Sequence, residues 1–148
     1  MSQPLLVLSS THVDQISAEL SIDDLVNLMA TVFRELQVGN DDGSTGQAQN
    51  ATGPVSIPHR VVVGTANHTV LFMPSRISNI GTAIKIVSVP STSAPSGVKS
   101  HGLPASTMII DEHSGDVVAI VNARKLTALR NAASQHLFSK LDWPSRGH

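Results

Sequence analysis

Five short runs of β-branched and other apolar residues constrain the fold more than any other feature of the 148-residue sequence. Each run is bounded by Gly, Pro, Asn or Asp, which is typical of strands separated by turns. The runs are HRVVVG, TVLFMP, TAIKIVSV, STMIID and DVVAIVN. The last two are joined by EHSG, which predicts a β-hairpin with Gly115 at a positive φ. We therefore predict one mixed, mainly antiparallel sheet.

Two helices are predicted before these strands. The apolar run Leu5–Leu8 indicates a first strand, and Ser10 or Thr11 could cap a short helix behind it. Ser21 stands three residues before Asp24, an acidic variant of the capping box. Apolar residues then recur at helical spacing as Leu25, Leu28, Met29, Val32, Phe33 and Leu36. This stripe predicts a longer helix that needs a surface to pack on.

Two loops and a last helix complete the predicted domain. Residues 38–56 are rich in Gly, Ser, Thr, Asn and Asp without periodicity, and residues 90–104 contain three Pro and two Gly. A helix is predicted over residues 123–141, with Asn122 as its N-cap. Residues 1–148 are thus expected to form a single α+β domain, in which helices pack on the sheet and the segment at 38–56 is a mobile connector.

Composition excludes several classes of function. Cysteine is absent, so thiolate metal sites, disulfides and thiol catalysis are excluded. The net charge of -1 gives no reason to expect nucleic acid or an anionic membrane as a partner. No signal peptide or membrane span is seen at the start, and we expect a cytoplasmic protein. The seven His are scattered, and His113 beside Asp111 and Glu112 indicates a polar hairpin turn, so no metal site is expected.

Three cations lie in or beside apolar segments. Arg130 falls between Leu126 and Leu137 on the apolar side of the last helix, where its charge needs an anion, carbonyl groups or water. The alternative is that Arg130 reaches solvent at the edge of the stripe or pairs with a structural carboxylate. Lys85 interrupts an apolar strand and is either paired or lowered in pKa, or faces solvent from an edge strand. Arg60 stands where a strand leaves a loop. If these cations converge, they suit a carboxylate.

Motifs for nucleotide and acyl chemistry are missing from the sequence. It contains no G-x-G-x-x-G between a strand and a helix, no Walker A sequence and no G-x-S-x-G. A nucleotide site of the usual kind and a serine hydrolase are therefore not expected.

Read in order, several short blocks resemble the ornithine cyclodeaminase/mu-crystallin family across most of residues 5–141. The blocks are PHR at 58–60, LFMP at 71–74, IKIVSV at 84–89, GLP at 102–104, the hairpin ending at Gly115, and LTALRNAA at 126–133. The resemblance implies the amino-terminal domain of that family, which dimerises and binds the substrate carboxylate, while a Rossmann domain binds NAD or NADP.

The resemblance assigns roles to four residues and leaves three hypotheses. It implies carboxylate binding by Arg60, Lys85 and Arg130, with Thr127 near the substrate or nicotinamide; no catalytic residue is assigned. The sequence lacks the acidic residue that ornithine-cyclising members place before Met73-Pro, so a ketimine reductase is the better expectation. The chain is then a truncated member acting on amino or cyclic imino acids, without catalysis alone. Alternatively it is a non-catalytic module that forms a homodimer or pairs with a full-length relative, or the product of an incomplete gene model.

Overall fold

The computed structural model describes residues 4–41, 55–78, 80–100 and 102–140. The predicted strands and helices are present. In chain order they are β1 (Leu6–Leu8), α1 (Ser10–Glu19), α2 (Ile22–Asp41), β2 (Val55–Ser56), β3 (Val61–Gly64), β4 (His68–Ile77), β5 (Gly81–Pro90), α3 (Ser96–Lys99), β6 (Ala105–Ile110), β7 (Val117–Asn122) and α4 (Leu126–Lys140).

The strands form one mixed sheet in the order β1-β7-β6-β5-β4-β2, with β3 also paired to β4. All pairs are antiparallel except β1 with β7. The long β4–β5 hairpin is the centre of the sheet. On one side β2 and β3 both pair with β4, and on the other side β6 pairs with β5 and β7 pairs with β6. The predicted α+β class with a mainly antiparallel sheet is confirmed.

Three boundaries differ from the sequence predictions. The segment at 38–56 is not all loop, since α2 continues to Asp41 and β2 forms at Val55–Ser56; residues 42–54 lie outside the described part. The loop at 90–104 contains the short helix α3. Asn122 ends β7 and does not cap α4: its Oδ1 accepts from Arg124 N at 3.3 Å, while the helix begins at Leu126.

The two amino-terminal helices begin with side-chain caps. For α1 the cap is Ser9 and not Ser10 or Thr11, because the Ser9 side chain accepts from His12 N. For α2 the predicted capping box is confirmed: Asp24 N donates to Ser21 Oγ at 3.1 Å, and Ser21 N donates back to Asp24 Oδ2 at 3.3 Å. Each cap satisfies backbone N–H groups that have no partner inside the helix.

The turn between β6 and β7 has the predicted geometry. Gly115 has φ 77° and donates its N–H to Asp111 O at 2.9 Å. The Asp111 carboxylate accepts from the backbone N of His113 at 2.9 Å and of Ser114 at 2.7 Å. These donors lower the pKa of Asp111, with the backbone bond from Ser114 having the largest effect. The polar residues here therefore build a hairpin turn.

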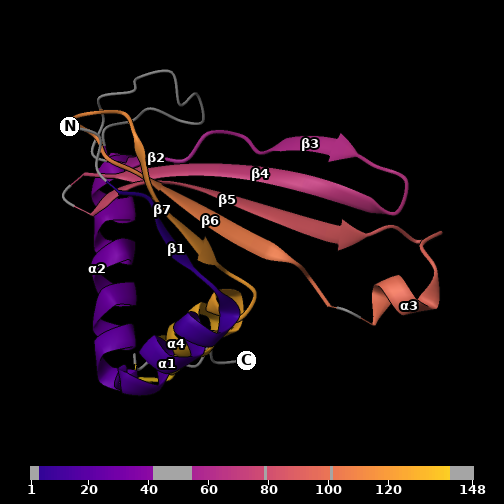
Figure 1. Cartoon of the computed structure of the whole chain (residues 1–148). Coiled ribbons are helices and arrows are strands. Elements are labelled where there is room, and N and C mark those ends of the chain that lie inside the picture. The colour runs from indigo at the N-terminus through magenta and orange to yellow at the C-terminus, as the bar shows by residue number, and fades with distance from the viewer. Residues whose placement is uncertain (1–3, 42–54, 79, 101, 141–148) are drawn as a thin grey trace.

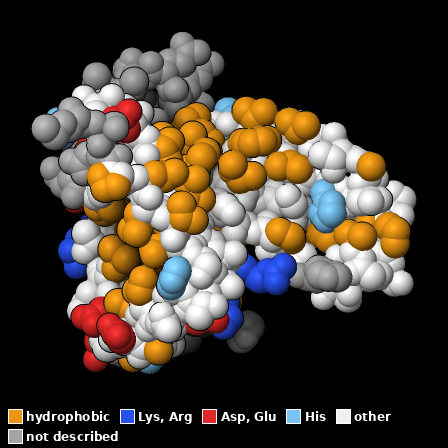
Figure 2. Space-filling view, viewed as in Figure 1, with side chains coloured by type: hydrophobic (Ala, Val, Ile, Leu, Met, Phe, Trp, Pro, Cys, Tyr) orange, Lys and Arg blue, Asp and Glu red, His pale blue; other side chains and the backbone are white. Residues whose placement is uncertain are grey.

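The packed core is small and lies mostly at one end of the molecule. Helices α1, α2 and α4 gather at that end, while β3, β4 and β5 extend beyond them toward α3 (Figure 1). Among the described residues, the buried apolar side chains are Val13, Val26, Val87, Ala94, Ala123 and Ala133. Figure 2 shows many apolar side chains at the surface, over the sheet as well as over the helices. Strands β4 to β7 are mostly half-buried, whereas β3 is exposed along its length.

Candidate carboxylate site between the sheet and the last helix

A hydrogen bond joins the middle of the sheet to α4. Lys85 Nζ donates to Thr127 Oγ1 at 2.7 Å, across 42 positions of sequence. Lys85 lies on β5, which is flanked by β4 and β6, so the edge-strand interpretation of this lysine is wrong. Its row across the sheet contains Met73, Thr107 and Val121. The ammonium group thus stands on a half-buried, otherwise uncharged surface that faces the first turn of α4.

Electrostatics around Lys85 disfavour its charge. Burial lowers the pKa of Lys85, and the positive Arg130 guanidinium lowers it further. No carboxylate contributes to this shift. Two cations near each other without an acid are stabilised by an anion that reaches both. The interpretation of Lys85 as a lysine with a lowered pKa is the one that the structure supports.

The other two predicted site residues are placed less tightly. Arg130 lies on α4, three residues after Thr127. Its side chain is exposed, whereas Ala133, three residues further along the same helix, is buried. Arg60 is exposed and precedes β3. The β3–β4 ladder ends with Val61 opposite Phe72. If the ladder continued by one residue, Arg60 would lie opposite Met73, which is itself opposite Lys85. Arg60 and Lys85 would then be two strand spacings, or roughly 10 Å, apart.

The sheet face opposite to Lys85 is apolar across several strands. Side chains alternate along a strand, so residues in one row share a face. One row without Lys85 contains Val7, Ile120, Met108, Ile84 and Pro74, and the next contains Ile86, Phe72 and Val61. We call these two rows, with Val63 and Val70, the apolar sheet face. Val7 and Val61 are each 59% exposed, so nothing in the described chain covers its margins.

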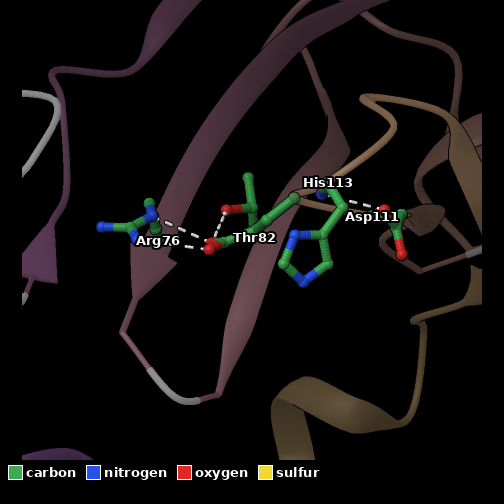
Figure 3. Close-up of polar contacts among 5 residues, drawn as sticks. Arg76, Thr82, Asp111 and His113 are labelled. Atoms are coloured by element: carbon green, nitrogen blue, oxygen red, sulfur yellow. Dashed lines mark hydrogen bonds and ion pairs between the residues drawn. The ribbon is translucent and has the colours of Figure 1, made fainter.

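An ion-pair cluster that was not predicted from the sequence lies next to the row of Pro74 and Ile84. Figure 3 shows its polar contacts. Arg76 on β4 binds both carboxylate oxygens of Glu112, at 2.9 and 3.2 Å, and Thr82 Oγ1 donates to the same carboxylate at 2.5 Å. The bonds from Thr82 and then Arg76 lower the pKa of Glu112. The only available signal was the register that places Arg76 opposite Thr82, which requires the strand pairing.

Other binding chemistry has little support in the described residues. They contain no group of three or more His, Asp or Glu that could hold a metal ion. None of the described helices combines the length and the apolarity that crossing a membrane requires. The turn from β1 to α1, where a strand meets a helix, contains Ser9 and no glycine, so it does not fit a pyrophosphate.

Comparisons with known proteins identify the fold. No family model matches the sequence, and no curated protein matches it. Solved structures do match, among them an archaeal alanine dehydrogenase dimer with bound NAD, at 18% identity and a TM-score of 0.64. Another is Δ1-pyrroline-2-carboxylate reductase of Thermococcus litoralis in complex with NADH and L-proline, at 22% identity and a TM-score of 0.66.

These matches cover most of this chain but only part of each matched chain. Each covers 88% of this chain, but only 34% of the alanine dehydrogenase and 36% of the reductase. The chain spans about a third of the length of the structures it matches. At these identities the likeness shows a common fold. The fold expected from the resemblance to the ornithine cyclodeaminase/mu-crystallin family is thus confirmed, and the chain has the fold of one part of these NAD-bound and NADH-bound proteins.

Proposed function

We propose that this chain binds the carboxylate of a small amino or cyclic imino acid through Lys85 and Arg130, as the substrate side of an NAD(P)-dependent reductase of the ornithine cyclodeaminase/mu-crystallin family. The observation that carries the proposal is the Lys85–Thr127 hydrogen bond of 2.7 Å, which joins β5 to the first turn of α4, the helix that also carries Arg130. Among the described residues, no acid contributes to the lowered pKa of Lys85. A carboxylate is the small anion that lysine and arginine donors bind in common.

Each residue has a distinct part in this proposal. Thr127 holds the Lys85 ammonium against the first turn of α4, and Arg130, one turn further, adds a planar donor pair. Arg60 reaches the ligand from the loop before β3. Burial disfavours the charged form of Lys85. A carboxylate bound beside Lys85 stabilises that charged form and raises the pKa of Lys85 again. We expect the nicotinamide cofactor to be held by protein outside these 148 residues, because the sequence contains no G-x-G-x-x-G between a strand and a helix.

The kind of reaction is inferred from the structural neighbours. One is a reductase of a cyclic imino acid, with L-proline in its structure, and the other is an amino acid dehydrogenase. A ketimine reductase is favoured over ornithine cyclisation because Val70, Leu71 and Phe72 leave no acid before Met73. We expect the purified 148-residue chain to oxidise no NADPH with pyrroline-2-carboxylate. Turnover by this chain alone would contradict the proposed division of labour.

Binding tests the site directly. Pyrrole-2-carboxylate, a stable planar analogue of a cyclic imino acid, is titrated calorimetrically into the wild-type chain and into Lys85→Met and Arg130→Gln. Each variant loses a charge-assisted hydrogen bond and is expected to bind about tenfold more weakly. Arg34→Gln removes an exposed arginine elsewhere and serves as the matched control. Equal binding by Lys85→Met and wild type would refute the site.

The pH dependence gives a second test of the same site. The protonated Lys85 binds a carboxylate and the neutral amine does not, so affinity is expected to fall as pH rises through the lowered Lys85 pKa. The fall begins at lower pH than an ordinary lysine would show. Lys85→Met should lack this fall, and pyrrole-2-carboxamide, which has no charge, should bind weakly at every pH.

A second function, a dimerising module without catalysis, is favoured by the apolar sheet face. Its two rows carry no charged side chain, and apolar patches of this kind mark sites of protein association. We propose a second copy of the chain as the occupant, since a two-fold axis lets one apolar face cover itself. A full-length relative with the same face could take the place of one copy.

The two sides of β3 provide a matched experiment for this pairing. Val61 and Val63 belong to the apolar sheet face, whereas Val62, 56% exposed, points to the other side. Light scattering is expected to give twice the 15.6 kDa chain mass for the wild type and for Val62→Lys. The double variant Val61→Lys, Val63→Lys should give the monomer mass. A monomeric wild type at micromolar concentration would refute the pairing.

A further inference from the structure

We infer that a hollow on the opposite side of the sheet from Lys85 is a second ligand site, which takes a carboxylate with a short apolar body. The hollow has a volume of about 410 Å³ and is lined by His68, Gly97, Val98, Pro104 and Arg124. This volume lies within the range of roughly 300–1,000 Å³ that is usual for small-molecule sites. The inference does not rest on the proposed function, because it uses none of the same residues.

Strand register separates the hollow from the first site. His68 is paired with Pro90 and Met73 with Lys85, so His68 and Lys85 stand an odd number of residues apart along the ladder. Side chains at such positions point to opposite faces. Pro104 accepts a hydrogen bond from Ser88 N at 2.9 Å, which continues the same even-numbered rows. The hollow therefore lies at the end of the apolar sheet face that is remote from Arg76 and Glu112.

Helix α3 forms one wall and is held in place by polar bonds. Lys99 Nζ donates to Thr92 O at 2.7 Å, and Ser100 Oγ donates to Gly97 O at 2.9 Å. These bonds engage the polar side chains of this short helix with its own backbone and its preceding loop. Val98 is then left as the side chain that α3 contributes to the hollow. Together with Pro104 it provides an apolar wall suited to a short hydrocarbon chain.

The charges around the hollow favour an anion. Arg124 and His68 supply its ionisable groups, and no acid is among its described lining residues. Neither side chain has a hydrogen bond or ion pair within the described chain, although the backbones of both are fixed: Arg124 N donates to Asn122 Oδ1, and His68 N donates to Thr65 Oγ1. Arg124 can therefore meet a carboxylate with two parallel N–H groups while His68 offers a ring N–H.

Hexanoate is the probe that tests the site. With the methyl groups of valine isotopically labelled, the Val98 signals are expected to move saturably in the NMR spectrum as sodium hexanoate is added. Hexylammonium, with the same chain and the opposite charge, should not move them. Arg124→Gln should weaken the effect about tenfold, since it loses a charge-assisted hydrogen bond. His68→Asp, which places an acid in the hollow and keeps Val98 as the reporter, should abolish the movement of the Val98 signals.

Variants of the two sites make the outcomes distinguishable. Lys85→Met should leave the hexanoate response of Val98 unchanged, and Arg124→Gln should leave unchanged the part of the pyrrole-2-carboxylate binding that Lys85→Met removes. Arg34→Gln on α2 is the control for loss of a surface arginine. Val98 signals that stay still, or that move equally in wild type and Arg124→Gln, would overturn the second site. Those results would leave the Lys85 site untouched.

Discussion

The helical end and the sheet arm of this molecule are built by different physics. We define the helical end as α1, α2 and α4, and the sheet arm as β3 with residues 68–73 of β4 and 85–90 of β5. At the helical end Ala133 is 0% exposed, and Phe33 and Phe138 meet with ring centroids 5.4 Å apart. In the arm, Val61 and Val62 are 59% and 56% exposed although they point to opposite faces.

The difference shows that strand formation and burial are separate requirements. The arm has complete ladders between β3, β4 and β5, so the backbone groups that face each other across these strands are satisfied without a packed core. Its apolar side chains still gain by being covered. The helical end has that cover within the chain, because α2 and α4 pack against each other. The arm instead leaves apolar side chains such as Val61 and Val62 exposed.

The largest expected effect is at the helical end. Ala133→Leu adds a large side chain at a fully buried position. Overpacking of this kind lowers the free energy of unfolding by about 1–3 kcal/mol. The adjacent Ala132 is exposed, so Ala132→Leu is the matched control and should change stability by less than about 0.5 kcal/mol. Urea denaturation measures both. Equal losses from the two variants would break the contrast between the two regions.

A smaller effect is expected at the start of α2. Ser21→Ala removes the acceptor for Asp24 N and should lower the unfolding free energy by about 1 kcal/mol. Ser139, exposed in the last turn of α4, donates to His136 O of its own helix and tests the generic effect of replacing a helical serine. Ser139→Ala should be neutral or slightly stabilising, because alanine is the better helix former. A neutral Ser21→Ala would show that packing of α2, and not its cap, determines where the helix begins.

Lys85 joins the two regions through its hydrogen bond to Thr127. The pH dependence of the unfolding free energy reports how far Lys85 is buried at this junction. Its pKa is lower in the folded chain than the ordinary 10.5, so the unfolded chain binds more protons between the two values. Unfolding free energy should therefore rise with pH through that window. Lys85→Met should remove this rise, and the difference between the two proteins isolates the residue. An identical pH profile for both would place Lys85 in free solvent.

The smallest expected effect concerns the exposed cluster that ties β4 and β5 to the hairpin turn. Because the pKa of Glu112 is lowered, its contribution to stability is present above the ordinary glutamate range and lost as pH falls through the lowered value. The melting temperature of Glu112→Gln should approach that of wild type at acid pH. Glu19→Gln, an exposed control on α1, should parallel wild type throughout. If the melting temperatures of both variants approached that of wild type at acid pH, the effect could not be assigned to the hydrogen bonds of Glu112.

Much of the local structure could be predicted because its causes are local. The alternation of apolar residues, the Ser21–Asp24 cap and the glycine of the last hairpin act within a few residues of each other. Helix starts were less accurate where several Ser, Thr or Asn competed, as with Ser9 and Asn122. The short strand β2 could not be predicted, since its existence depends on pairing with Arg76 and Ile77 of β4.

By itself, the sequence determined the strands, the main helices, the lack of a glycine-rich nucleotide motif, and three cations out of place among apolar residues. Only the tertiary structure decided how these cations lie relative to one another. It joins Lys85 to Thr127 and brings Arg130 near, while Arg60 stays at the end of β3. The reason is that strand order and register, which are long-range and cooperative, determine both the row in which Lys85 stands and the face that remains uncovered.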